Sequence, residues 1–422
     1  MLLTSEEAPL ALPARSCKYI TCRYAAREYV EGKGAPLNPK IDFIYVDSGG
    51  GHRAAATALL DVIRRQNRPW DIRLLSIQDL LQRIDFIRKS TGIEFQEVYN
   101  IILRRGWTIV TPPLVPVAHT LIRLAHAAQE RILEEHWKAG PPDMVVSLIP
   151  HYNRAMFQAL SRVAPGAPFV TILTDLADYQ SNFWMERQNQ FVVCPTERSV
   201  QQARALGLAD RLILPASGVI LNPRFYAPLP ADREAARVSL GLRPGRPTGL
   251  ILFGGEGSTE IERIVRLLNE SDLDMQLIAL CGHNRRAVDA VRALPARIPI
   301  FVQGFTQEIP HYMALADFFI GKPGPGSISE AIAMRLPVIV ERNAWTLPQE
   351  RYNTEWVEKQ GVGIVIKNFA QIAGAVREML TPECYAQYRR AAAAIHNSAV
   401  FEVPQMLEAI LQNRESRNLL AS

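Results

Sequence analysis

Short apolar runs alternate with longer amphipathic segments along most of the chain. Residues 41–46 read IDFIYV, and a glycine-rich turn, SGGGH, separates them from an alanine-rich segment at residues 53–65. A buried strand that leads through a glycine turn into a helix is typical of the start of a doubly wound α/β domain. Further apolar runs between helical segments predict a parallel sheet. These strands are predicted at residues 72–76, 144–148, 169–174 and 191–193.

A second series of the same kind begins near residue 249. Residues 250–253 predict a strand, and the turn GGEGS at residues 254–258 joins it to a helix. The predicted fold class is therefore α/β, with two Rossmann-like doubly wound domains that face each other across a cleft. The later strands of this series are predicted at residues 276–281, 300–303, 318–320 and 338–341.

Changes in composition divide the chain into five parts. Prolines mark an N-terminal arm, and prolines and charged residues indicate a linker between the two strand series. At 422 residues, two domains are also the natural expectation from length. The expected parts are an arm at 1–40, a first domain at 41–218, a linker at 219–246, a second domain at 247–381 and C-terminal helices at 382–422.

Charge and cysteine content restrict the setting in which the chain works. The formal net charge of +5 allows an anionic membrane as a partner without requiring one, and no nucleic-acid partner is predicted. Five cysteines without metal-ligand spacing indicate neither a zinc site nor a disulfide framework, so a reducing cytoplasm is expected. No apolar run approaches the roughly 20 residues that span a bilayer, so any membrane contact is expected to be peripheral.

The clearest chemical pattern lies at residues 322–353. Gly324 and Gly326 precede Ser327 and a helical run. A glycine-rich turn that opens a helix exposes unpaired N–H groups, and these attract phosphate. The pattern therefore predicts a phosphate site at the start of this helix.

Carboxylate and amide groups follow at spacings that suit sugars. Glu330 lies one turn into the helix, where a carboxylate can accept hydrogen bonds from two sugar hydroxyl groups. About twenty residues later, Gln349 and Glu350 can hold a second sugar. Phosphate and two sugars together predict a nucleotide-sugar donor site.

This region resembles the donor site of glycosyltransferase family 28, and within it the monogalactosyldiacylglycerol synthases and bacterial diacylglycerol glycosyltransferases. Those enzymes pair a KxGPGxxxEA block with a later QExxN block, and both occur here. The resemblance covers about residues 41–380 and implies the GT-B fold, with C-terminal helices that pack back on the first domain. It implies that Glu330 binds the ribose of UDP, that residues 324–327 face the pyrophosphate, and that Gln349 and Glu350 contact the transferred sugar.

The resemblance extends to two more donor segments. Residues 254–258 resemble a GGGEG loop, so they are expected to contact the donor phosphates. Phe305, in the stretch GFTQEIPHYMALAD, would bracket uracil, and its alternative role is that of a core phenylalanine. The contacts expected from the loop are those of Gly254, Gly255, Gly257 and Ser258.

The turn SGGGH matches the family at the other end of the chain. By resemblance, His52 faces the acceptor hydroxyl and serves as general base. An imidazole titrates near neutral pH, and the positive end of a helix would keep it uncharged. Gly50 and Gly51 would let the acceptor approach the backbone closely. The alternative is that His52 only caps the helix or orients a backbone group.

Asp175 lies in the segment TILTDLADYQSNFW, which resembles the TDL segment of the family. It is expected to end a strand, where such domains place ligand contacts. Asp175 is therefore a second candidate for the base, an orienter of His52, or a carboxylate that only caps the next turn.

Several departures from the family pattern fall on the acceptor half. Family histidines are replaced by Ile149 and Gln180, a tryptophan by Phe183 and an arginine by Asn222. These changes leave the donor prediction intact and put diacylglycerol as the acceptor in question.

The resulting prediction is an inverting glycosyltransferase that moves a hexose from a UDP-sugar to a membrane lipid, with diacylglycerol as the leading acceptor. The alternatives are another lipid, such as a lipid A precursor or a polyprenyl carrier, or a nucleotide-sugar-binding protein without activity. No cofactor or metal is expected, although residues 272–274 show a DxD pattern that we interpret as a solvated loop. The chain is expected on the cytoplasmic face of a membrane, with residues 82–117 as the candidate contact surface.

Overall fold

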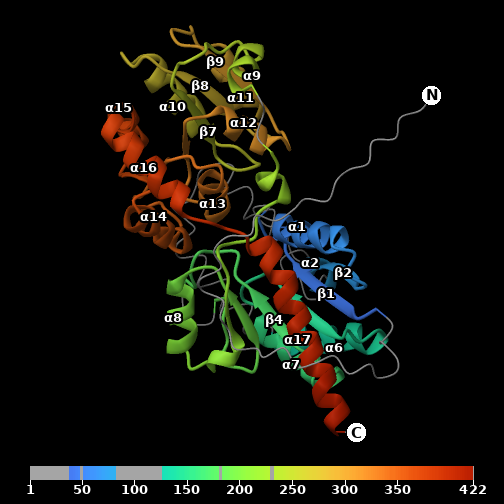
Figure 1. Cartoon of the computed structure of the whole chain (residues 1–422). Coiled ribbons are helices and arrows are strands. Elements are labelled where there is room, and N and C mark those ends of the chain that lie inside the picture. The colour runs from blue at the N-terminus through green and yellow to red at the C-terminus, as the bar shows by residue number, and fades with distance from the viewer. Residues whose placement is uncertain (1–37, 48–50, 82–125, 180–182, 229–231, 422) are drawn as a thin grey trace, which may run out of the picture. The chain divides into compact units, whose positions relative to one another are not determined.

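The computed structural model describes residues 38–47, 51–81, 126–179, 183–228 and 232–421 (Figure 1). Three of the predictions lie outside the described residues. They are residues 1–37 of the arm predicted at 1–40, the acceptor contact at Gly50 and the membrane surface at residues 82–117.

Six parallel strands form the first sheet, in the order β2-β1-β3-β4-β5-β6. The chain adds β2 on one side of β1 and all later strands on the other side, so the strand order reverses between β1 and β3. In such sheets ligands bind outside the carboxyl ends of the strands at this switch point. The strands are β1 (Lys40–Tyr45), β2 (Asp71–Ser76), β3 (Met144–Ser147), β4 (Phe169–Ile172), β5 (Phe191–Cys194) and β6 (Ile213–Pro215).

The second sheet also has six parallel strands, in the order β12-β11-β10-β7-β8-β9. Its order reverses between β7 and β10, and these two strands lead into the two predicted donor segments. Because β7 and β10 are parallel neighbours, residues 254–258 and 322–327 both lie at the carboxyl ends of the central strands. The strands are β7 (Thr248–Leu252), β8 (Gln276–Leu280), β9 (Ile300–Gln303), β10 (Phe318–Gly321), β11 (Val338–Glu341) and β12 (Gly363–Ile366).

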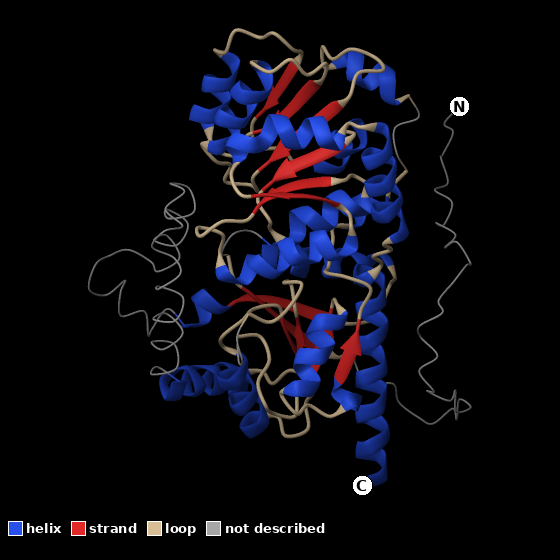
Figure 2. Cartoon of the chain, turned by 90° about the vertical axis from the view of Figure 1, so that its left-hand side faces the viewer, coloured by secondary structure: helices blue, strands red, loops and turns tan. Residues whose placement is uncertain are grey.

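Helices cover both faces of the second sheet (Figure 2). Successive side chains of a strand point to opposite faces, and β7 shows the result: Leu250 and Leu252 pack in one hydrophobic cluster and Ile251 in another. Its helices include α10 (Glu260–Asn269), α11 (Arg285–Arg292), α12 (Ile309–Leu315), α13 (Pro325–Ala333), α14 (Pro348–Gln360), α15 (Ile372–Met379) and α16 (Pro382–Ala394).

The last helix of the chain, α17 (Ala399–Ala421), packs against the first sheet rather than the second. Figure 1 shows it beside α1. Its Val400, Val403 and Leu407 are fully buried in one cluster with Ile41 and Leu59. Burial of each such side chain contributes about 1.5–3 kcal/mol. The helices that follow the first sheet's own strands are α1 (Gly51–Arg65), α2 (Ile77–Leu81), α6 (His126–Ala139), α7 (Asn153–Val163) and α8 (Glu197–Ala205).

The segment predicted as a linker at residues 219–246 contains a helix, α9 (Arg233–Ser239). The Arg237 side chain is only 3% exposed and donates to Asp317 Oδ2 at 2.8 Å and to the Leu315 carbonyl at 2.9 Å. A buried guanidinium is stable only with such partners. The later part of the predicted linker is therefore anchored to the second sheet.

Candidate active site

His52 lies in the first turn of α1, at the switch point of the first sheet. Its Nδ1 is 2.8 Å from the carbonyl oxygen of Leu148, just after β3, and 3.1 Å from Thr174 Oγ1. A carbonyl oxygen only accepts hydrogen bonds, so Nδ1 carries the proton and Nε2 keeps its lone pair. Burial lowers the pKa of His52 to about 4, although the Leu148 hydrogen bond acts in the opposite direction. At neutral pH the ring is thus uncharged, with Nε2 available to accept a proton.

Asp175 comes three residues after β4, not at its end, because strand pairing stops at Ile172. Its Oδ2 accepts a hydrogen bond of 2.9 Å from Trp184 Nε1. Burial raises the pKa of Asp175 to about 7; the Trp184 hydrogen bond opposes this rise, and the negative charge of Glu350 adds to it. A carboxyl group from the first sheet thus interacts electrostatically with one from the second.

Trp184 was not among the predicted site residues. It is fully buried, and its ring centroid lies 5.8 Å from that of His52. Its backbone N–H donates to Asp178 Oδ1 at 3.1 Å, and its carbonyl accepts from Asn153 Nδ2 at 2.9 Å. Two backbone hydrogen bonds and one from the indole fix Trp184 in place. Its ring therefore lies near His52 and also contacts Asp175.

The glycine turn after β7 packs against the turn after β8. Gly254 and Gly257 have positive φ angles of 76° and 72°, and a Cβ atom on Gly257 would lie 2.0 Å from the Cys281 carbonyl oxygen. The His283 N–H donates to the Gly255 carbonyl at 2.8 Å. Only glycine fits at residue 257, because both its backbone angles and its surroundings exclude a side chain. Ser258, which ends the turn, accepts through Oγ from the N–H of Glu260 at 3.2 Å, where α10 begins.

The glycine turn after β10 opens α13. Gly324 is the N-cap residue, no side chain caps the helix, and Pro325 occupies the first turn. Gly326 and Ser327 follow in that turn, so their backbone N–H groups lie at the start of the helix without a side-chain cap. This is the arrangement that favours an anion.

Glu330, one turn further into α13, is partly buried. Among the described residues, none forms a hydrogen bond or ion pair with its carboxyl group. Burial raises the pKa of Glu330 to about 7. A carboxyl group held in this way without a partner is suited to accept hydrogen bonds from a ligand.

Unsatisfied polar atoms gather at the start of α14. Gln349 Oε1 and Asn353 Oδ1 are buried without a hydrogen-bond partner among the described residues. Asn353 Nδ2 donates to the Pro323 carbonyl at 2.8 Å, and this bond connects α14 to the turn after β10. Glu350 is buried, and its Oε1 lies 3.7 Å from Lys322 Nζ. The sequence prediction named Gln349 and Glu350 but gave no role to Lys322.

Phe305 is 49% exposed, so its alternative role as a core residue is wrong. Its ring stacks on that of His283 with centroids 4.1 Å apart and an interplanar angle of 13°. A Cβ atom on Gly255 would lie 3.8 Å from Phe305 Cε2. The stacked pair therefore stands beside the glycine turn after β7.

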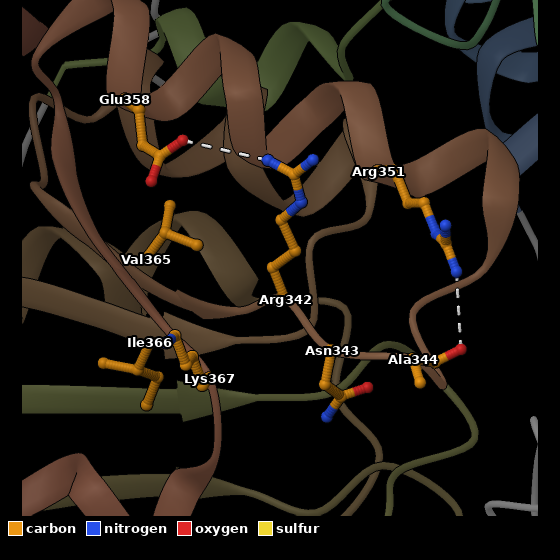
Figure 3. Close-up of a pocket in the computed structure, with 8 residues that line it drawn as sticks. All are labelled: Arg342, Asn343, Ala344, Arg351, Glu358, Val365, Ile366 and Lys367. Atoms are coloured by element: carbon orange, nitrogen blue, oxygen red, sulfur yellow. Dashed lines mark hydrogen bonds and ion pairs between the residues drawn. The ribbon is translucent and has the colours of Figure 1, made fainter.

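A separate pocket of about 560 Å³ lies at the carboxyl ends of β11 and β12 (Figure 3). Arg342 in this pocket is paired with Glu355 at 2.9 Å and with Glu358 at 4.0 Å. None of the predicted site residues lines it. The lining residues are Arg342, Asn343, Ala344, Arg351, Glu358, Val365, Ile366 and Lys367.

The two carboxylates of the DxD pattern lie on the surface. Asp272 pairs with Arg377 and Asp274 with Arg246, and the two aspartate side chains are 80% and 79% exposed. Within the part of the chain that the structure describes, no group of three or more His, Cys, Asp or Glu is placed to hold a metal ion.

The fold is that of GT-B glycosyltransferases. The structure superimposes on MurG of Acinetobacter baumannii with a TM-score of 0.60, at 13% identity over 88% of this chain and 100% of that one. The calicheamicin glycosyltransferase CalG4 gives a TM-score of 0.58 at 17% identity over 89% and 99% of the two chains. Anabaena HepE, in complex with UDP-glucose, gives 0.51 at 15% identity over 89% and 100%.

Residues 250–404 match the glycosyltransferase family 28 C-terminal domain. The chain is 26% identical to a probable chloroplastic monogalactosyldiacylglycerol synthase of Nicotiana tabacum, over 91% of this chain and 74% of that protein. The corresponding synthase of Spinacia oleracea is also 26% identical, over 90% and 74%. Residues 250–404 thus match the C-terminal domain of glycosyltransferase family 28, and the chain as a whole is similar to the galactolipid synthases.

Proposed function

We propose that this protein is a family 28 hexosyltransferase that moves a hexose from a UDP-sugar to a membrane lipid, most simply diacylglycerol, with inversion at the anomeric carbon. One observation carries the proposal. A neutral imidazole with a free Nε2 stands at one switch point, and two glycine turns with an unpartnered carboxyl group, Glu330, stand at the other.

The reaction follows from these groups. His52 Nε2 takes the proton of the acceptor hydroxyl while the acceptor oxygen bonds to the anomeric carbon. The bond between that carbon and the β-phosphate oxygen breaks, and its electron pair leaves on UDP. The Leu148 carbonyl, which accepts from Nδ1 at 2.8 Å, stabilises the imidazolium that forms. This support matters because burial makes His52 a weak base in the free protein.

Each part of the UDP-sugar donor has its own proposed binding residues. Glu330 would hold the ribose, the two glycine turns the diphosphate, Phe305 the uracil, and Gln349 with Glu350 the hexose. The structural likeness to HepE in complex with UDP-glucose supports a UDP-sugar donor. This proposed mechanism includes no metal ion, since helix N-termini can stabilise a departing diphosphate.

The lipid acceptor is supported by the similarity to galactolipid synthases. We infer a peripheral position on the cytoplasmic face of a membrane, because such an acceptor lies in a bilayer. Among the described residues, no helix combines the length and apolar character needed to cross one.

UDP release tests the proposal. The protein is incubated with UDP-galactose, UDP-glucose, UDP-N-acetylglucosamine or UDP-glucuronate, each with and without vesicles that contain diacylglycerol. We expect release with one donor that depends on diacylglycerol, and a new glycolipid in mass spectra of the extract. Release that needs a different lipid would replace the acceptor. UDP-sugar binding without release under any condition would identify a binding protein instead.

A further inference from the structure

Lys322, the residue that follows β10, lies between the two glycine turns. A Cβ atom built on Gly254 would be 3.8 Å from Lys322 Cε, and one built on Gly324 would be 3.4 Å from the same atom. The side chain therefore runs past the turn after β7 and the turn that opens α13. These are the two segments expected to hold the donor phosphates.

The charge of Lys322 is only partly balanced. Its nearest carboxylate among the described residues is that of Glu350, and the 3.7 Å between Nζ and Oε1 is too long for a hydrogen bond. The lysine side chain is 36% exposed, whereas the glutamate side chain is 11% exposed. The ammonium group thus keeps donors for a ligand while one acid holds it in place.

Bond cleavage in the proposed reaction places one additional negative charge on the diphosphate. Uncapped N–H groups of α13 supply partial positive charge there. A full positive charge at a fixed position next to the diphosphate stabilises the transition state, in which this negative charge develops, more strongly than it stabilises the ground state.

We propose that Lys322 is a catalytic residue that stabilises the diphosphate leaving group, and that Glu350 fixes its position. The inference rests on the proposed UDP-sugar donor. It means that the Lys322 ammonium group and the N-terminus of α13 together stabilise the diphosphate. A purely structural role is the competing explanation, in which Lys322 only neutralises Glu350 so that α14 keeps its place.

Nucleotide binding separates the two explanations. UMP lacks the β-phosphate, so we compare UDP and UMP affinities by calorimetry in the wild type, Lys322→Met and Lys322→Arg. We expect Lys322→Met to weaken UDP binding about 10- to 100-fold, as for a lost hydrogen bond to a charged group. UMP binding should remain within about twofold. Lys322→Arg should keep most of the preference for UDP.

Turnover provides the second readout. Lys322→Met should lower kcat about 100-fold or more, as expected when one stabilising group of a developing anion is lost. Lys359→Met, an exposed lysine near the end of α14, is the matched control and should leave both measurements unchanged.

Three outcomes would contradict the inference. They are an unchanged ratio of UDP to UMP affinity in Lys322→Met, a variant that raises only the KM for the UDP-sugar, and a Lys322→Arg variant that loses the UDP preference as fully as Lys322→Met. The second outcome would mean that Lys322 only supports Glu350. If the wild type binds no UDP, the proposed donor itself is wrong, so the two failures are distinguishable.

Discussion

The Nδ1 atom of His52 is 2.8 Å from the carbonyl oxygen of Leu148, and this contact joins the start of α1 to the end of β3. The two strands before these residues, β1 and β3, flank the switch point of the first sheet. The fold itself therefore selects the tautomer of the imidazole, because the backbone carbonyl can only accept. An imidazole with a defined free nitrogen therefore results from backbone geometry.

Replacement of His52 should slow catalysis strongly without weakening donor binding. We expect His52→Ala to lower kcat about 100-fold or more, the usual effect of a lost general base. The UDP dissociation constant should stay within about twofold, because the residues proposed to bind UDP belong to the domain of the second sheet. Steady-state kinetics and calorimetry measure the two effects, with Thr57→Ala, at an exposed position of α1, as the control. Wild-type turnover in His52→Ala would leave Asp175 as the preferred base.

The pH dependence of turnover should report Asp175. Burial raises its pKa to about 7, while that of His52 is lowered to about 4. Above pH 5 His52 stays neutral, so we assign the expected loss of kcat below pH 7 to protonation of Asp175, the second candidate for the base. Measured at saturating UDP-sugar, where Glu330 is occupied, kcat should fall about tenfold per unit below pH 7. In Asp175→Asn kcat should be lower and nearly flat between pH 5 and 8. A profile with the same midpoint as the wild type would assign the titration to another group.

The indole of Trp184 should tune this midpoint. Its N–H donates to Asp175 Oδ2 at 2.9 Å, and this hydrogen bond opposes the rise in the pKa of Asp175. Trp184→Phe keeps an aromatic ring and removes the donor, so the pKa of Asp175 should rise further. The acidic limb of kcat should then move to higher pH by about half a unit to one unit, which corresponds to roughly 1 kcal/mol. A midpoint that stays in place in a folded variant would show that the hydrogen bond has no such effect.

Much of the fold follows from local sequence pattern. The predicted bounds of β9 and β11 match the structure, and the strands around them differ by one or two residues at their ends. The strands β6 and β12 were missed. β6 has only three residues and ends in proline, and β12, GIVI, begins with glycine, a residue that is depleted in strands.

The contacts within the site were less predictable. The glycine turns and Glu330 were found because a motif fixes their place on a helix. The contact of His52 with Leu148 joins the start of α1 to the residue after β3, whereas the hydrogen bond of Trp184 to Asp175 lies within the segment between β4 and β5. The sequence comparison assigned the tryptophan position of the family to Phe183, whereas the adjacent Trp184 makes these contacts. Periodicity reveals neither contact, because the first depends on which strands become neighbours and the second lies outside helices and strands.

Replacement of Glu330 with glutamine should weaken UDP binding. In the ligand-free protein at high pH, the same replacement should raise the stability of the fold. Hydrogen bonds to a charged group are worth about 1.5–3 kcal/mol, so Glu330→Gln should bind UDP about 10- to 100-fold more weakly. In the free protein, burial raises the pKa of Glu330 to about 7. Between pH 4.5 and 7 the folded state therefore holds a proton that the unfolded state releases, and stability falls as pH rises.

Glutamine does not ionise, so the variant should escape this loss. The difference in Tm between Glu330→Gln and the wild type, without ligand, should be more positive at pH 8 than at pH 5, by about 2 °C or more. Excess UDP should reverse the order at pH 8, because it stabilises the wild type more strongly. Scanning calorimetry at both pH values measures this, with Glu383→Gln, at an exposed position of α16, as the control. An identical Tm difference at the two pH values, with unchanged UDP affinity, would remove Glu330 from the donor site.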